Sequence, residues 1–444
     1  MRNPTATLLL APLIAVIPLA RPATPLAPAA PSALDDATSR ELAAIREKVA
    51  RATAKLGEKA GLPEVPDKFQ PIPPDARWLT AAEAKHAFAK APAKLETLRW
   101  WKIGLDPTKL DHALREPASV VSCGVHAQGA GLDGGERALA LAREAADFLI
   151  WAQTQGGTGV FPFPASTGKE NDRAFAAAAG FLKKAAQAGK LDEFVHNGWI
   201  VDDHGDGGLQ FDNGEAGVAL LELYEVSHAP SYLESARKAA DWAFARPLSP
   251  NWNYNSFSVY LLAKFFAVTH EAKYLTAAID KARVGVIPGQ LTDGPRAGRW
   301  LDAHNARPAY HYIMMRALAE LATVLPNESP ERIEVMRALR LGLRARNQDF
   351  LGVGAPNEDK AMEVLVFVNR RFAEEKDFLR ETLSVEALDA LAKLVSSQSL
   401  RGRDPLGPRE WSLFLEYVAT RATPESPPKA APDQTSSVPA ARRR

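Results

Sequence analysis

Apolar residues recur every three or four positions along most of the chain, which is the spacing that places them on one face of an α-helix. A clear case is the segment 39–59, where Leu42, Ile45, Val49 and Leu56 share a face and charged residues take the others. Many later segments are rich in alanine, which favours helices. The pattern predicts an all-α protein with helices over 81–98, 118–129, 136–155, 172–188, 214–227, 231–245, 256–268, 272–284, 309–325, 330–349, 359–371, 385–397 and 409–420.

The connections between these helices alternate in length. Short links such as 227–232 join the helices of one pair, whereas long links rich in Gly, Pro, Asn and aromatic residues join one pair to the next. A weak repeat supports the pairing, because ADFLIW at 146–151 and ADWAF at 240–244 lie about ninety residues apart. In a closed ring of helical hairpins, the long links gather at one end and line a single cleft. These links occupy 156–166, 195–217, 246–256 and 287–308.

The N-terminus has the features of an export signal. Arg2 precedes an apolar run at 8–20, and small residues follow it. The run is too short and too interrupted by proline to span a membrane, although an uncleaved anchor is the alternative. We expect a mature protein that is periplasmic or secreted, with no stable membrane insertion. The expected divisions are a signal peptide over 1–33, a leading helix and proline-rich linker over 34–74, a main domain over 75–420 and a disordered tail over 421–444.

Composition narrows the class of protein. The chain has 444 residues, of which 46% are hydrophobic, so it can bury a large core. Its formal net charge is +1, and its basic residues are scattered among acidic ones, so no nucleic-acid partner is expected. Cys123 is the single cysteine, which excludes an intrachain disulfide.

The long aromatic links, together with GGTGVFPFP at 156–164 and the run FDNGEAGVALLELYEVSHAPSYLESARKAADWAF at 211–244, resemble the six-hairpin (α/α) toroids of carbohydrate-active enzymes. These include pectate-lyase-like and other polysaccharide lyases, and glycosidases of the same architecture. The likeness lies in the style of repeat and covers roughly 75–420. It implies a single toroid domain of about six hairpins and a polysaccharide substrate.

The acidic segment 195–217 is the first candidate for chemistry. Asp206, Asp212 and Glu215 can supply a general acid and base across a glycosidic bond, with Trp199 as a sugar contact. The start of the segment also partly resembles a calcium loop, so a calcium ion at Asp202 and Asp206 is an alternative to catalysis. The third possibility is a purely structural loop.

The second candidate is NWNYNS at 251–256. Breaking a uronide by β-elimination requires a group that neutralises the C5 carboxylate, a base for the C5 proton and an acid for the leaving oxygen. Asn253 can bind the carboxylate, Tyr254 can move the proton, and Trp252 can stack on a sugar. The alternative is a helix entry in which Asn255 or Ser256 is the N-cap.

The third candidate is GRWLDAHNARPAYHY at 298–312. Its members combine cations, proton carriers and aromatic rings near the start of a helix whose first turn follows Pro308. That helix N-terminus also favours an anionic group. His311 is the exception, because a lone histidine within a helix is more often a core residue. The candidates are Arg299, Trp300, His304, Arg307, Tyr310 and His311.

Together these features predict an exported all-helical toroid that degrades a polysaccharide, and the lyase hypothesis comes first. It assigns the catalytic roles to Asn253, Tyr254, Arg299, His304 and Tyr310. A glycoside hydrolase that uses the acidic segment is the second hypothesis, and a non-catalytic sugar-binding or scaffold protein is the third. No cofactor is expected apart from the possible calcium ion.

Overall fold

The computed structural model describes residues 69–421 apart from 103–105, 167–172, 206, 303, 353, 357–358 and 404–405, and also residues 40, 43 and 47. The expected signal peptide, most of the leading helix and nearly all of the expected tail lie outside the described residues. Within the described ranges, the chain is predominantly helical, as the apolar spacing predicts. In the same ranges, no helix is long and apolar enough to cross a membrane.

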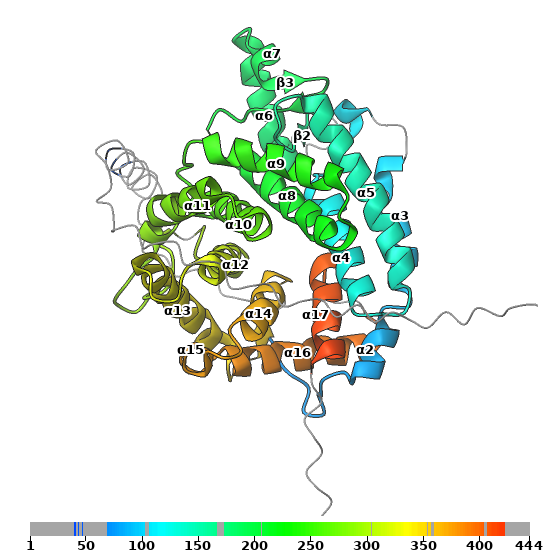
Figure 1. Ribbon diagram of the computed structural model, residues 1–444, viewed down its shortest axis with the longest axis vertical. Helices are drawn as coiled ribbons and strands as arrows, with labels where there is room; N and C mark the ends of the chain where they lie inside the picture. The colour runs from blue at the N-terminus through cyan, green and yellow to red at the C-terminus, as the bar shows by residue number, and fades with distance from the viewer. Residues whose placement is uncertain are drawn as a thin grey trace, which may run out of the picture.

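Six helices form a closed inner ring around the axis of the molecule (Figure 1). Each packs against the next in chain order, and the last packs against the first. Their sequence order is therefore also their order around the ring. The inner helices are α4 (Arg115–Gly129), α8 (Gly208–Ser227), α10 (Trp252–Thr269), α12 (Pro308–Val324), α14 (Asp359–Arg371) and α17 (Pro408–Thr420).

Six further helices cover the outside of this ring, one against each inner helix. Five of them follow their inner partner in the chain: α5 (Gly135–Gly156), α9 (Pro230–Ala245), α11 (Ala272–Gly285), α13 (Pro330–Phe350) and α16 (Ser384–Leu400). The sixth, α2 (Ala81–Ala87), precedes the whole ring and packs against α17, so the first and last helices close the circle. The predicted toroid is confirmed: it has six inner–outer helix pairs, of which five are successive in the chain and the sixth joins its two ends.

The remaining elements lie in the connections. The helix expected over 81–98 is interrupted, and its second part is α3 (Ala91–Thr97), which packs on α5. The link between α5 and α8 contains α6 (Arg173–Gln187), α7 (Leu191–Phe194) and an antiparallel sheet in the order β2 (Phe163–Pro164), β4 (Trp199–Ile200), β3 (Val195–His196). Two short elements follow later, α15 (Lys376–Glu381) and β5 (Ala355–Pro356), and β5 pairs with β1 (Phe69–Gln70).

Small residues allow the inner helices to approach closely. A Cβ atom added at Gly214 of α8 would stand only 2.8 Å from the Cβ of Phe257 on α10. Because α8 and α10 have neighbours on several sides, most of their residues are buried. Both helices are consequently apolar over most of their surface, and the polar residues that they do bury require a specific partner.

Helix α8 begins earlier than its sequence pattern predicts. Gly207 takes a left-handed conformation (φ 96°) before the first helical residue, and the Asp203 carboxylate accepts hydrogen bonds from the amides of Gly207 and Leu209. This side-chain cap starts the helix at Gly208, so much of the polar segment expected to be a loop is helical. Helix α10 likewise begins at Trp252, with Asn251 as its N-cap residue in place of Asn255 or Ser256.

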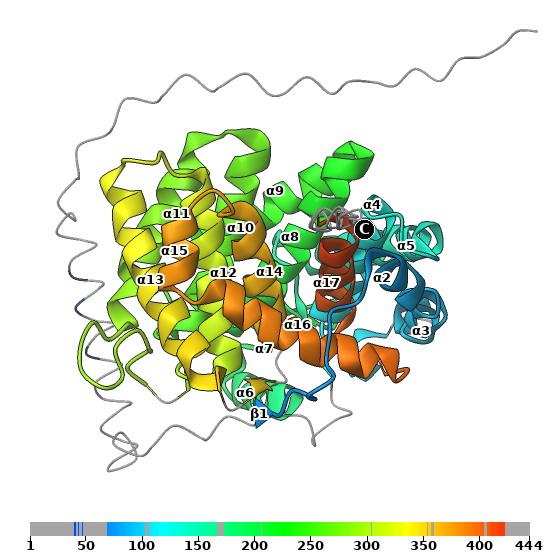
Figure 2. The same cartoon turned by 90° about the horizontal axis from the view of Figure 1, so that it is seen from below.

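The chain before α2 crosses the outside of α16 (Figure 2). The Leu79 amide donates to Ser396 Oγ at 3.1 Å, and the indole nitrogen of Trp78 donates to Asp389 at 2.8 Å. The chain just before α2 therefore packs on the toroid.

Candidate functional site

The starts of the inner helices meet at one end of the ring, which we call the mouth. Arg115, the first residue of α4, places its Nε 3.4 Å from the Asp212 carboxylate of α8. The amide of Gly407, the N-cap of α17, donates to Asp359 at the start of α14 at 3.3 Å. These contacts place the starts of α4, α8, α14 and α17 at one end of the ring, which agrees with the expectation that the links leading into the inner helices meet there.

A buried ionic network joins three inner helices just inside the mouth. The ammonium of Lys360 on α14 lies 3.1 Å from Glu215, 3.0 Å from Glu363 and 2.9 Å from Glu410. The guanidinium of Arg409 pairs with the other carboxylate oxygen of Glu215. Burial alone would lower the pKa of Lys360, but the carboxylates outweigh it and the pKa is raised. Lys360 therefore stays charged at neutral pH.

The ionic column continues along the axis through Arg316 of α12. Its Nη1 lies 2.7 Å from Glu320, and its Nε is 3.5 Å from Glu363. The guanidinium also stacks on Tyr260 and Phe367, with its carbon 4.5 Å and 3.6 Å from the ring centres. Burial raises the pKa of Tyr260 well above its ordinary value, so this phenol stays neutral.

Between the Lys360 and Arg316 layers lies a cavity of about 10 Å³. This is about the space needed by one water molecule, whereas pockets that hold drug-sized ligands are commonly of about 300–1,000 Å³. A sugar ring has no room inside this column. The lining residues are Glu215, Ser256, Phe257, Tyr260, Ile313, Arg316, Lys360 and Glu363.

The two predicted acids of α8 are both engaged in ion pairs. Asp212 is 1% exposed and accepts from the Arg115 amide at 3.1 Å, and burial raises the pKa of Asp212. The Arg115 guanidinium lies 4.2 Å above the ring of Phe211, which stacks on Phe257. Glu215 is likewise buried between Lys360 and Arg409. Neither carboxylate is presented to solvent as the expected loop would have presented it.

Asp359 differs from the other acids of the mouth because it is partly exposed. Burial, and next the charge of nearby Glu410, raises the pKa of Asp359 to about 6. A carboxyl group with this pKa is partly protonated near neutral pH, which is the property that a general acid requires.

The second and third sequence candidates touch each other at the rim of the mouth. The side-chain amide of Asn253 on α10 donates to Asn305, just before α12, at 2.8 Å. Next to Asn305, the imidazole of His304 stacks on the ring of Tyr310, with the ring centres 4.3 Å apart. Desolvation against its neighbours lowers the pKa of His304 below 6.5, so the imidazole is neutral at pH 7. Arg307, the N-cap residue of α12, is exposed beside this pair.

Three of the predicted catalytic or binding side chains have structural roles instead. Asn253 is 1% exposed, and its amide nitrogen is shared between Asn305 and Asn251. The Arg299 guanidinium pairs with Asp349 of α13 at 2.5 Å. His311 is fully buried, and its Nε2 donates to the carbonyl of Gly342 at 2.9 Å, because a carbonyl can only accept. Burial lowers the pKa of His311 well below its ordinary value, which leaves it neutral.

The three tryptophans proposed as sugar contacts are all buried. Trp199 packs edge-on against Trp151, and Trp252 lies so close to Gly289 that an added Cβ would stand 2.6 Å from the indole. Trp300 donates from its indole nitrogen to the carbonyl of Val286 at 3.1 Å. Each ring is at most 1% exposed, which corrects the expectation that they present a face to a substrate.

The start of the acidic segment is occupied by internal contacts. Arg246 pairs with both Asp202 and Asp203, and Asp202 also accepts from the amide of His204 at 2.7 Å. Asp206 lies outside the described residues, so the expected calcium ion stays a prediction. Across the parts of the chain that the structure describes, no group of three His, Cys, Asp or Glu side chains is arranged to hold a metal.

The ionic column itself was missed in the sequence, although it left a signal there. Arg316 and Glu320 are the two charged residues of the otherwise largely apolar run from 313 to 324. Charges inside such a run are almost never buried without a partner. The same argument applies to Lys360 and Glu363 on α14, which stand three residues apart and share an ion pair.

The fold and site define the class of the protein: a closed (α/α) toroid of six inner and six outer helices, with titratable side chains gathered where its inner helices begin. No protein-family model matches the chain, and no curated protein sequence matches it. Among solved structures, an unsaturated glucuronyl hydrolase mutant from Streptococcus agalactiae is similar at a TM-score of 0.47 and 13% identity, over 81% of this chain and 97% of that one.

Two other solved structures show similar alignments. A glycosyl hydrolase of family 88 from Bacteroides vulgatus has a TM-score of 0.41 and 10% identity, over 77% of this chain and 98% of its own. A polysaccharide lyase has a TM-score of 0.39 and 12% identity, over 76% of this chain and 96% of its own. The assignment of the fold rests on the helix contacts described above, and the function is argued from the side chains.

Proposed function

We propose that the protein degrades a polysaccharide containing uronic acid by β-elimination, at the rim of the mouth. The observation that carries this proposal is the His304–Tyr310 stack beside the exposed Arg307, at the start of α12. These residues combine a neutral base, a phenol and a cation in one place. The proposal includes export of the protein, because a polysaccharide of this kind lies outside the cell.

Each rim residue has a role in the elimination. Arg307 and the N-terminus of α12 bind the C5 carboxylate, which makes the C5 proton more acidic. The neutral imidazole of His304 takes that proton. The bond from C4 to the leaving oxygen breaks, a double bond forms between C4 and C5, and the phenol of Tyr310 protonates the leaving oxygen.

A substrate panel and two variants test this function. Cleavage of pectic, alginate or glycosaminoglycan substrates should raise the ultraviolet absorbance, because elimination leaves a conjugated double bond. His304→Ala should lower the rate by about 10²-fold or more, as expected when a positioned proton-transfer group is lost. His86→Ala is the matched control, because His86 has a side chain that is 84% exposed and pairs with Asp133 away from the rim. Full activity in His304→Ala would overturn the assignment.

Hydrolysis is the second candidate function, and Asp359 is the observation that favours it. With a pKa of about 6, this carboxyl is suited to protonate a leaving oxygen, and Glu410 lies close enough to influence it. A hydrolase would produce reducing ends with no rise in ultraviolet absorbance. Asp359→Asn would then lower the cleavage rate more than His304→Ala does. Equal binding of one panel polysaccharide by wild type and variants, with no cleavage, would instead favour a binding protein.

The pH dependence separates the two reactions. Elimination needs neutral His304, so its kcat/KM should rise with pH through a pKa below 6.5 and level off near neutrality. Hydrolysis with Asp359 as the acid needs the protonated form, so its kcat/KM should fall as the pH rises above about 6.

A further inference from the structure

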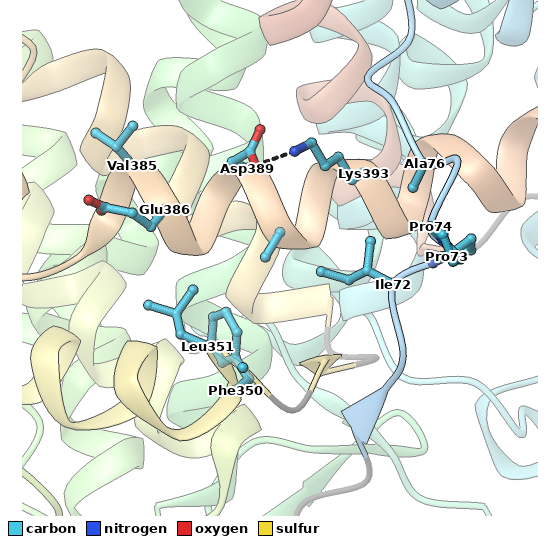
Figure 3. Close-up of a pocket in the computed structure, with 12 residues that line it drawn as sticks. Ile72, Pro73, Pro74, Ala76, Phe350, Leu351, Val385, Glu386, Asp389 and Lys393 are labelled. Atoms are coloured by element: carbon cyan, nitrogen blue, oxygen red, sulfur yellow. Dashed lines mark ion pairs between the residues drawn. The ribbon is translucent and has the colours of Figure 1, made fainter.

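A groove of about 660 Å³ lies on the outside of the toroid (Figure 3), and none of its lining residues belongs to the ionic column. Helix α16 forms one wall, the end of α13 forms the second, and the chain at 72–76 forms the third. Its lining is largely apolar: Phe350 is buried beneath it, Leu351 and Ile72 are partly exposed, and Val385 is 52% exposed. A groove with apolar walls can accept the apolar face of an amphipathic helix.

The chain itself supplies a segment that needs such a surface. The sequence 39–59 carries an apolar stripe at helical spacing, including Ile45 and Val49. The described residues of this segment, Arg40, Ala43 and Glu47, are helical and exposed. At a 3.6-residue period, these three positions fall opposite to the stripe in the sequence pattern. A helix with one apolar face gains most of its stability in a protein from packing that face.

We propose that the groove is the docking site of the amphipathic segment 39–59 of the same chain. The continuously described chain begins at Phe69, and Ile72, Pro73 and Pro74, just after it, form a wall of the groove. Residues 60–68 can span up to about 30 Å, so the segment can reach any part of it. Because the segment is tethered there, its effective concentration is in the millimolar range, which favours it over a free partner or a second copy.

The charges of the two surfaces support this occupant. The segment has six basic and three acidic residues. The rim of the groove carries the exposed acid Glu386, whereas Asp389 already pairs with Lys393 at 2.8 Å and accepts from Trp78. Glu386 is therefore positioned to attract a basic side chain that flanks the apolar stripe.

Hydrogen exchange of the full mature chain, measured by mass spectrometry, tests the proposal. In the wild type, amides of 39–59 should exchange at least about tenfold more slowly than in an unstructured chain, because docking protects them. Val385→Asp in the groove and Ile45→Asp in the stripe should each remove that protection. Glu386→Lys should reduce it, whereas Glu47→Lys, on the exposed face of the segment, should leave it unchanged.

Exchange of the α8 and α10 amides in the same experiment reports whether each variant remains folded. If Val385→Asp lowers the protection of those core helices as well, its effect on 39–59 reflects unfolding. The effect of Glu386→Lys on the exchange of 39–59 then tests the docking. Rapid exchange of 39–59 in the wild type would overturn the proposal. Protection that survives both Val385→Asp and Glu386→Lys, or that appears only as the protein self-associates at high concentration, would overturn it too.

Discussion

Replacing Lys360 with methionine removes the central cation of the ionic network and leaves its three carboxylates in place. Glu215 keeps its contact with Arg409, and Glu363 keeps Arg316, but Glu410 loses the ammonium 2.9 Å away. Removing one partner from a buried ion pair costs about 3–5 kcal/mol. Because two of the carboxylates retain a cation, we expect the lower end of that range, about 3 kcal/mol.

Thermal unfolding by calorimetry measures this loss. With about 2 cal/mol/K of unfolding entropy per residue over the toroid, a change of this size lowers Tm by about 4 °C. Lys238→Met is the control, because its ammonium is 3.4 Å from Glu234 on the surface, with side chains 53% and 70% exposed. Such a pair contributes at most about 1 kcal/mol, so the control should unfold close to the wild type.

The pH dependence of the stability difference between wild type and Lys360→Met tests whether lost ion pairing causes it. Burial alone would raise the pKa of Glu410, but Lys360 and Arg409 outweigh it, so the pKa is lowered. A lowered carboxyl pKa stabilises the folded protein above the ordinary value of 4.5, and this stability is lost as the pH falls. The difference in Tm between wild type and Lys360→Met should therefore have its full size at pH 7 and become smaller below about pH 4.5. A gap that is absent, or equal at both pH values, would refute the reasoning.

The other predictions concern packing and processing. Gly214→Ala should destabilise the protein by about 1–3 kcal/mol, because the new Cβ would stand 2.8 Å from the Cβ of Phe257. Gly180→Ala on α6 has no neighbouring atom within 4 Å and should be neutral or stabilising by up to about 1 kcal/mol; equal unfolding curves for the two variants would contradict this. Intact mass of protein recovered from its host should show a first residue between Arg21 and Leu34 rather than Met1. Deleting the chain after Thr423 should leave Tm nearly unchanged, and a large drop would show that this tail packs on the domain.

Local patterns in the sequence determined the architecture. Apolar residues at helical spacing predicted the helices of the ring, because this period depends only on the geometry of one helix. The alternation of short and long links then predicted hairpins and a common end for the long links. Those features need no knowledge of distant contacts, since they follow from neighbouring residues along the chain.

The starts of individual helices were less accessible. Helix α8 begins at Gly208 because the side chain of Asp203 folds back to cap it, and the polar composition of the segment conceals this contact. The expected acidic loop therefore became a helix that carries Asp212 and Glu215 into the ring. The sequence therefore singled out Asp212 and Glu215, but it did not show that both carboxylates are buried in ion pairs.

Only the tertiary structure decided which side chains share a site. Glu215 and Glu410 lie far from Lys360 in the sequence, yet ring closure brings both carboxylates within 3.1 Å of the Lys360 ammonium. Packing between other parts of the chain buries Trp199 against Trp151 and His311 against α13, although their residue types had suggested binding. Burial and ion pairing depend on which helices become neighbours, so they are properties of the whole ring. The stack of His304 on Tyr310 formed within a single predicted segment, which is why the sequence alone could propose both residues together.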